Sequence, residues 1–78
     1  MTKGEYRVGI NFNPSNDNIV DRLKRAAADL IDLIDSIPIG DTQNMQVTEV
    51  ARTKALAQTA IEEGTMWAVK AATKPKDE

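Results

Sequence analysis

The fold is decided by residues 52–72, which read RTKALAQTAIEEGTMWAVKAA. Small and apolar side chains recur here at steps of three and four, which is typical of an amphipathic helix, and we predict a helix over residues 47–73. Gly64 costs about 1 kcal/mol relative to alanine inside a helix, so its presence predicts a close crossing of two backbones. The face expected to meet a partner helix carries Val50, Ala57, Ile61, Gly64, Ala68 and Ala71.

A second helix is predicted over residues 15–37. Apolar side chains again recur at alternating steps of three and four, and Ser15 or Asn16 can cap the helix start. Pro38 ends the pattern, and the polar segment 40–46 has an ordinary length for a hairpin turn. The sequence therefore predicts an all-α fold, an antiparallel two-helix hairpin, in a single domain over residues 1–78.

Residues 5–12 show a different pattern. Their apolar side chains alternate with polar residues or glycine, and they are Tyr6, Val8, Ile10 and Phe12. This alternation predicts a short strand or an extended N-terminal arm that lies on an apolar surface of the hairpin.

The small size of the chain favours self-association. A domain of 78 residues buries only about 60% of the surface of its unfolded chain, and without cysteine it has no disulfides to support it. Leu56, Ala60 and Trp67 lie on a second face of the later helix, which an isolated pair of helices cannot bury. We expect this face to pack between subunits of a compact homo-oligomer.

Composition excludes several classes of function. The chain has no cysteine and no histidine, which excludes zinc sites built on thiolate or imidazole and the usual nucleophile and base pairs of hydrolases. We therefore predict no catalytic residues, no cofactor and no metal site. Asp29, Asp32 and Asp35 do not change this, because positions three apart drift round a helix.

The charge and hydropathy of the chain also restrict its partners. A net charge of −2 gives no global field for a long nucleic acid or an anionic membrane. No segment approaches the ~18 apolar residues of a membrane span, and the first residues lack the apolar core of a signal peptide. We expect a cytoplasmic protein.

Basic side chains occupy the first half of the earlier helix, against the preference of the helix dipole. They are Arg22, Lys24 and Arg25. An anion pocket near the helix start explains this arrangement. A solvated face with an Arg25–Asp29 pair explains it as well.

Arg52 repeats the inversion at the start of the later helix. A guanidinium can grip a phosphate through two parallel N–H bonds and can stack on a base. A surface ion pair with Glu49, or with an aspartate near the end of the earlier helix, is the alternative interpretation.

Phe12 is the best candidate for a plate on which a purine base could stack, because it precedes a proline and lies outside the predicted helices. Packing of the arm is the alternative role for this ring. Asn11, Asn13 and Ser15 can donate or accept hydrogen bonds at base edges or phosphates, or they can cap the helix.

Two segments resemble a known family: EEGTMWA at residues 62–68 and NFNPS at residues 11–15, together with a Leu-Lys-Arg helix at 23–25. Over residues 9–74 the chain is similar to the helical-hairpin domain of phage-encoded sponges that sequester cyclic nucleotide signals of bacterial immunity, the anti-CBASS and anti-Thoeris group. The resemblance implies compact oligomers, commonly hexamers, which hold cyclic dinucleotides or cyclic trinucleotides in separate pockets between subunits. A related branch carries an extra domain and binds cyclic ADP-ribose isomers.

The resemblance also implies roles for single residues. Lys24 matches a lysine that contacts phosphate in the dinucleotide pocket, and Phe12 is the candidate for the aromatic ring that stacks on the base. Arg52 matches an arginine that lines the trinucleotide pocket, with Thr59 further along the same helix. Gln58 stands where a basic residue is expected.

The sequence thus predicts a phage immune-evasion sponge that binds cyclic oligonucleotides in the cytoplasm of the infected bacterial host without cleaving them. Asn11, Asn13 and Thr59 would add hydrogen bonds to the ligand. The alternative is a structural or adaptor hairpin whose second apolar face docks a partner protein. An enzyme that destroys the signal is disfavoured, because the expected metal ligands and histidines are missing.

Overall fold

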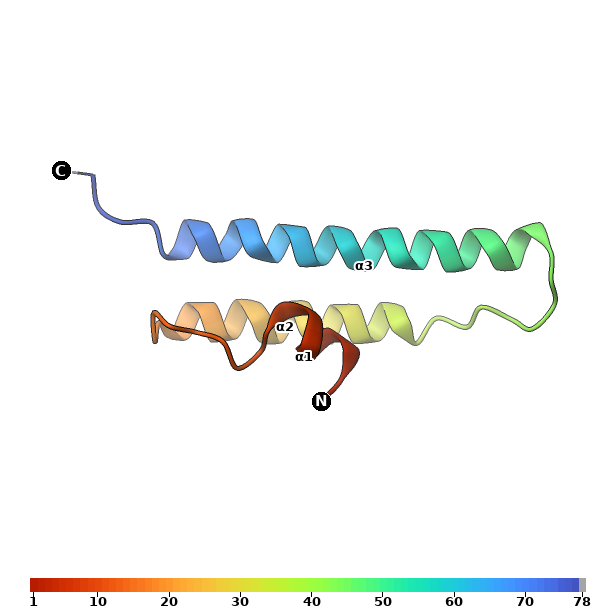
Figure 1. Cartoon of the computed structure of the whole chain (residues 1–78), viewed down its shortest axis with the longest axis horizontal. Helices are drawn as coiled ribbons and strands as arrows, with labels where there is room; N and C mark the ends of the chain where they lie inside the picture. Colours follow the sequence, from red (N-terminus) through yellow and green to blue (C-terminus); the bar gives the residue numbers. More distant parts are fainter. Residues whose placement is uncertain (78) are drawn as a thin grey trace.

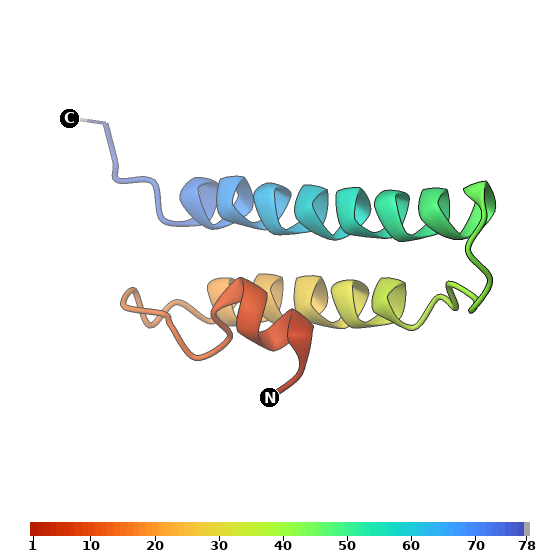
Figure 2. The same ribbon diagram turned by 45° about the vertical axis from the view of Figure 1, so that its right-hand side comes forward.

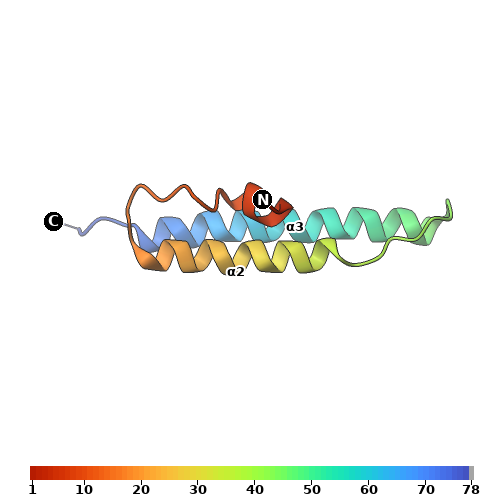
Figure 3. The same ribbon diagram turned by 90° about the horizontal axis from the view of Figure 1, so that it is seen from below.

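The computed structural model describes residues 1–77, which form three helices and contain no strand: α1 (Lys3–Val8), α2 (Asn18–Asp35) and α3 (Met45–Ala72). α2 and α3 lie antiparallel, and α1 crosses α2 (Figure 1). Seen from below, the molecule is a narrow rod of 57 × 25 × 13 Å with α1 resting on the helix pair (Figure 3). The prediction of an all-helical hairpin is confirmed for the described residues.

The two connecting segments lie at opposite ends of the rod. The segment between α2 and α3 closes one end of the hairpin (Figure 2). The segment between α1 and α2 reaches the other end, where α3 finishes (Figure 2). Residues near position 12 are thereby brought close to the last turns of α3.

Side-chain caps set where α2 and α3 begin. The Asp17 carboxylate accepts the Ile19 N–H at 3.1 Å, and the Asn44 side-chain oxygen accepts the Val47 N–H at 2.9 Å. Each bond satisfies a backbone donor that has no partner inside the helix. The predicted start at Ser15 is therefore wrong, and the other predicted ends differ by only one or two residues.

The prediction of an extended arm over residues 5–12 is wrong, because Lys3–Val8 is helical. Thr2 and Glu5 form a capping box: the Thr2 hydroxyl accepts the Glu5 N–H at 3.1 Å, and the Glu5 carboxylate accepts the Thr2 N–H at 2.8 Å. Gly9 ends the helix in the left-handed region with φ 64°, which glycine adopts without strain. These local caps outweigh the alternating pattern, since a lone strand has no neighbour with which to pair.

The apolar core is thin and belongs to one helix. Within residues 1–77 the buried apolar side chains all come from α2: Val20, Ala27, Ala28 and Ile31. α3 contributes a buried polar side chain, Gln58, which is 2% exposed. The second face of α3 is open in the protomer, with Leu56 54% and Trp67 62% exposed and Ala60 also exposed. No helix among the described residues is long and apolar enough to cross a membrane.

The close backbone crossing is at Gly4 and not at Gly64. A Cβ atom on Gly4 would overlap the carbonyl oxygen of Ala28, whereas a Cβ atom on Gly64 would meet no atom within 4 Å. The Gly4 N–H also donates to the Asp32 carboxylate at 2.7 Å. Within the protomer the predicted crossing at Gly64 is therefore wrong, and Gly4 seats α1 on α2.

Polar contacts hold the rest of α1 in place. The Arg25 guanidinium donates to the Glu5 carboxylate at 2.8 Å, and the Lys3 ammonium donates to Asp35 at 3.0 Å. Arg25, with help from the Thr2 N–H, lowers the pKa of Glu5 to about 2. Lys3 first, and then Gln58, also hold the pKa of Asp35 below its usual value. Each of these carboxylates is thus stabilised in its charged form by a contact that forms when α1 docks on α2.

We expect Gly4→Ala to destabilise the protein by about 1–3 kcal/mol, because the new methyl group meets backbone that cannot rotate away. Urea unfolding measures the loss. Gly64→Ala is the matched control and should stabilise by about 1 kcal/mol, since its methyl group enters open space. Equal stabilities of Gly4→Ala and wild type would contradict the described seating of α1.

Stability should fall in acid because α1 depends on ionised carboxylates. A carboxyl group whose pKa is lowered by folding stabilises the protein above its unfolded pKa, and this contribution is lost as pH falls toward the folded value. For Glu5 the window runs from 4.5 down to about 2. Urea unfolding at about pH 5 and about pH 2.5 should show a smaller acid loss for Glu5→Gln than for wild type. Glu63→Gln, which removes an exposed carboxyl group of α3, should keep the wild-type loss.

Candidate functional site at the end of the hairpin

Lys24 is the centre of the candidate site. Its side chain leaves α2 toward the segment that joins α1 to α2, and it is only 7% exposed. The ammonium group donates to the carbonyl oxygen of Gly9 at 3.1 Å and also to that of Phe12. A buried ammonium group is costly unless hydrogen bonds replace its water, and these two carbonyl groups supply them.

The Phe12 ring stands beside this ammonium group. Lys24 Nζ lies 5.4 Å from the centroid of the ring, a cation–π arrangement. The Phe12 N–H donates to the Gly9 carbonyl oxygen at 2.9 Å, which closes a tight turn, and the side chain remains 70% exposed. The structure therefore places together the predicted cation and the predicted stacking ring, and Phe12 remains largely exposed.

Asn13 has a structural role in the protomer. Its amide N–H groups donate to the Asp17 carbonyl oxygen at 2.9 Å and to the Asp21 carboxylate at 3.0 Å. Its side-chain oxygen accepts the Ser15 hydroxyl at 2.6 Å. These bonds tie the connecting segment to the start of α2, which corresponds to the capping alternative for both residues.

Two small cavities flank Lys24, and both are also lined by Val69. One has a volume of about 220 Å³ between the connecting segment and the end of α3, with Phe12, Asn13 and Thr73 in its wall. The other, of about 260 Å³, lies between α1 and α3 and includes Arg7 and Thr65. Lys24 is the basic side chain shared by the two cavities.

Sequence reasoning missed two residues of this site at the end of α3: Val69 in its last turns and Thr73, which caps it. They lie one turn apart, and the Thr73 hydroxyl donates to the Val69 carbonyl oxygen at 2.8 Å. The antiparallel pairing could have indicated them, because it places the last turns of α3 beside the first turns of α2, where Lys24 stands. Arg7 was hidden by the interpretation of residues 5–12 as an arm.

Arg52 and Thr59 do not join this site. A rise of 1.5 Å per residue separates Arg52 from Thr73 by about 30 Å along α3. Arg52 donates to the Glu49 carboxylate at 2.7 Å, which is the predicted alternative of a surface pair, and Thr59 is exposed on the same helix. Any site built on these two residues is a separate one.

The side-chain amide of Gln58, next to Thr59, already has hydrogen-bond partners within the chain. Its amide N–H groups donate to the Ile31 carbonyl oxygen and the Asp35 carboxylate, both at 3.2 Å. Its side-chain oxygen accepts the Lys3 ammonium at 2.9 Å. A basic residue at this position would lie beside Lys3, whereas the amide accepts from α1 and donates to two acceptors of α2 at once.

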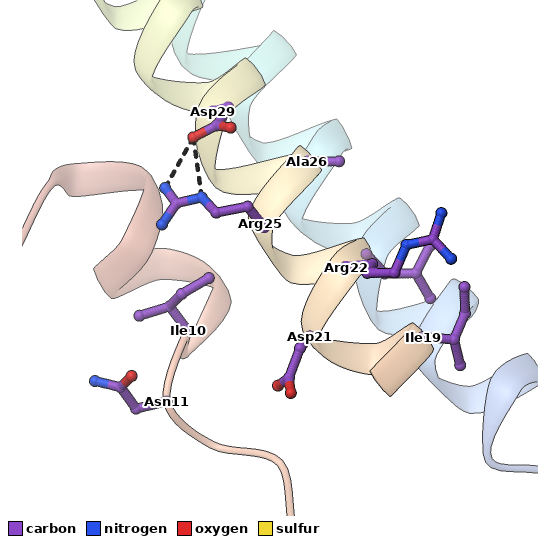
Figure 4. A pocket seen from close by; sticks show the side chains of 9 residues that line it. Ile10, Asn11, Ile19, Asp21, Arg22, Arg25, Ala26 and Asp29 are labelled. Carbon is purple, nitrogen blue, oxygen red and sulfur yellow. Dashed lines mark hydrogen bonds and ion pairs between the residues drawn. The ribbon is translucent and has the colours of Figure 1, made fainter. Parts of the chain in front are cut away.

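The basic residues at the start of α2 have separate environments. Arg25 donates to Asp29 at 2.8 Å, as the surface-pair alternative predicts, and also reaches Glu5. Arg22 instead lines an open groove of about 940 Å³ between the connecting segment and α2, together with Ile10, Asn11 and Ile19. Figure 4 shows Arg22 directed away from the Arg25–Asp29 pair. Asn11 is the predicted site residue that lines this groove.

The acidic residues of α2 do not gather into a metal site. Asp29 pairs with Arg25, Asp32 accepts the Gly4 N–H, and Asp35 pairs with Lys3. Across residues 1–77, no group of three acidic side chains is arranged to hold a metal ion.

The fold and the site define a small helical-hairpin protein with a cationic and aromatic site at one end. The family model described as "Acb2/Tad1, hairpin domain" matches residues 4–73. The chain therefore belongs to this family, the phage cyclic-nucleotide sponge family, whose hairpin domain sequesters ligands and is not an enzyme. No curated protein and no solved structure matches the chain.

Proposed function

We propose that this protein is a phage immune-evasion sponge that sequesters cyclic di- or trinucleotide messengers of bacterial anti-phage signalling without cleaving them. It would act in the cytoplasm of the infected bacterial host. The observation that carries the proposal is the match to the sponge family over residues 4–73. The pairing of Lys24 with the exposed ring of Phe12 supports it, because a cyclic nucleotide offers both an anion and an aromatic base.

The first ligand site is built on Phe12 and Lys24. A base stacked on the exposed ring of Phe12 would gain about 1–3 kcal/mol. The Lys24 ammonium has three N–H donors, of which two bond the connecting segment, so one remains for a phosphate oxygen. Asn11, which precedes Phe12 in the sequence, would offer a donor and an acceptor to the base edge from the groove that it lines, and Asn13 contributes by holding the segment.

A single protomer does not enclose such a ligand. The cavities beside Lys24 measure about 220 and 260 Å³, whereas ligand pockets are typically about 300–1,000 Å³ and bury most of the ligand. We propose that neighbouring subunits complete the pocket in a homo-oligomer. The resemblance to the sponge family favours a hexamer. Leu56, Ala60 and Trp67 supply the exposed apolar face for this contact.

A second ligand site would use Arg52 and Thr59 on the exposed side of α3. Arg52 would exchange its Glu49 partner for a phosphate, with which it can form two parallel N–H bonds. Gln58 has a neutral amide, which is buried and bonded to α2, so it adds no positive charge to this site. We therefore propose that this trinucleotide site is weaker than the site at Phe12.

The first test is isothermal titration of the assembled protein with cyclic dinucleotides, cyclic trinucleotides and cyclic ADP-ribose isomers. Phe12→Ala should weaken dinucleotide binding about 5- to 150-fold, since it removes one stacking plate. Arg52→Ala should weaken trinucleotide binding and leave dinucleotide binding unchanged. Tyr6→Ala, which removes an aromatic ring that is 78% exposed on α1, is the control for Phe12.

Ligand recovered after denaturation should be intact, in one equivalent per site. Cleaved ligand would contradict sequestration. No binding of any cyclic nucleotide to the assembled protein would reject the proposal and favour an adaptor hairpin, which uses the same apolar face to dock another protein.

Assembly is tested by Trp67→Glu, because Trp67 is largely exposed in the protomer and its loss should leave the hairpin folded. We expect sedimentation to show smaller species and ligand affinity to fall, while the helical circular dichroism remains. Leu33→Glu is a comparison on α2, where a side chain that is 66% exposed is replaced in the same way. Unchanged sedimentation of Trp67→Glu would contradict the proposed interface.

A further inference from the structure

We propose that Lys24 is a positioning residue, whose ammonium group clamps the Gly9–Phe12 turn and thereby fixes the orientation of the Phe12 ring. The proposal rests on the proposed function only where it concerns the ligand, since the clamp itself exists without one. It gives Lys24 a task that is separate from any contact with phosphate.

The first argument is the number of bonds that converge on the turn. The Gly9 carbonyl oxygen accepts both the Phe12 N–H at 2.9 Å and the Lys24 ammonium at 3.1 Å. The Phe12 carbonyl oxygen accepts the same ammonium group. One buried cation of α2 therefore holds both ends of the turn from which the ring projects.

The second argument is that the ring has little else to hold it. With 70% of Phe12 exposed, packing does not fix its direction. The neighbouring anchors act on other residues: the Ile10 N–H bonds α1 at 3.0 Å, and Asn13 bonds the start of α2. Within residues 1–77, Lys24 supplies the side-chain hydrogen bond to the Phe12 backbone.

The clamp has a consequence for affinity. A ring held in one orientation before binding loses less conformational entropy when a base stacks on it. Removal of Lys24 should therefore weaken stacking on Phe12 as well as any phosphate contact. Effects of two residues that act through each other are not additive, whereas those of independent contacts are.

The orientation can be measured in the ligand-free protein, because the chain has a single phenylalanine. Incorporation of 4-fluorophenylalanine gives one ¹⁹F resonance, which reports on Phe12 alone. Lys24→Met retains the apolar stem and removes the ammonium group, and it should shift this resonance toward its position in the unfolded chain and narrow it.

Lys54→Met is the matched control. Lys54 also donates to two backbone carbonyl oxygens, those of Asp35 at 2.8 Å and Ile37 at 2.6 Å, but at the opposite end of α2. Its replacement removes the same kind of bonds and should leave the ¹⁹F resonance in place. A wild-type resonance in folded Lys24→Met would overturn the proposal.

If Lys24→Met does not fold, the wild-type protein decides. One lysine ammonium signal should exchange slowly with water and show a nuclear Overhauser effect to the Phe12 ring protons. The absence of such a protected signal would overturn the clamp.

A double-mutant cycle then tests the link to binding, with the cyclic dinucleotide as the probe. The fold-loss caused by Lys24→Met should be smaller in a Phe12→Ala background than in wild type. Equal fold-losses would show that Lys24 acts only through its own contact, and would overturn the link. Failure of all cyclic nucleotides to bind would reject the proposed function, while the ¹⁹F result would still decide the clamp.

Discussion

The thin apolar core is the constraint on which the rest of the structure depends. The buried apolar side chains of residues 1–77 number four, and two of them are alanines. Burial of so little apolar surface cannot by itself fix a short helix and two connecting segments against a hairpin. Directional polar bonds therefore set the positions of these parts, and their donors are mainly lysine and glutamine side chains.

Three such side chains each make hydrogen bonds to more than one partner. Lys24 bonds two carbonyl groups at one end of α2, Lys54 bonds two at the other end, and Gln58 joins the three helices between them. Each side chain serves several partners, so each fixes a geometry that apolar contact alone would leave loose. Leu56, Ala60 and Trp67 of α3 take no part in these bonds, and they remain exposed on its second face.

The sequence was sufficient to predict the two long helices, α2 and α3, because the spacing of their apolar side chains indicates which faces are covered. It also contained the signal for α1, since Thr2 and Glu5 have capping-box spacing and Gly9 follows at the helix end. The alternation of Tyr6 to Phe12 competed with this signal and led to the wrong prediction of an arm. Side-chain caps are specific evidence, whereas alternation without a partner strand is weak.

Phe12 and Lys24 of the candidate site were predicted from the sequence, whereas Val69, Thr73 and the geometry of the site were not. The resemblance indicated both Phe12 and Lys24. In the structure, Lys24 Nζ lies 5.4 Å from the centroid of the Phe12 ring. Neither periodicity nor spacing could show that Lys24 is buried, because its burial depends on the return of the segment after α1. The sequence likewise could not show the structural role of Gln58. Its amide bonds Lys3 of α1 and Ile31 and Asp35 of α2.

The reversed charges at the start of α2 acquire a physical explanation from this packing. Glu5 and the carbonyl groups of Gly9 and Phe12 fold back onto Arg25 and Lys24 and provide the negative partners that the helix dipole does not. The cations are thus stabilised by the protein itself before any ligand arrives. The Lys24 ammonium group is buried and oriented by folding, so an anion that bonds its remaining proton would meet a site whose main ordering has already occurred.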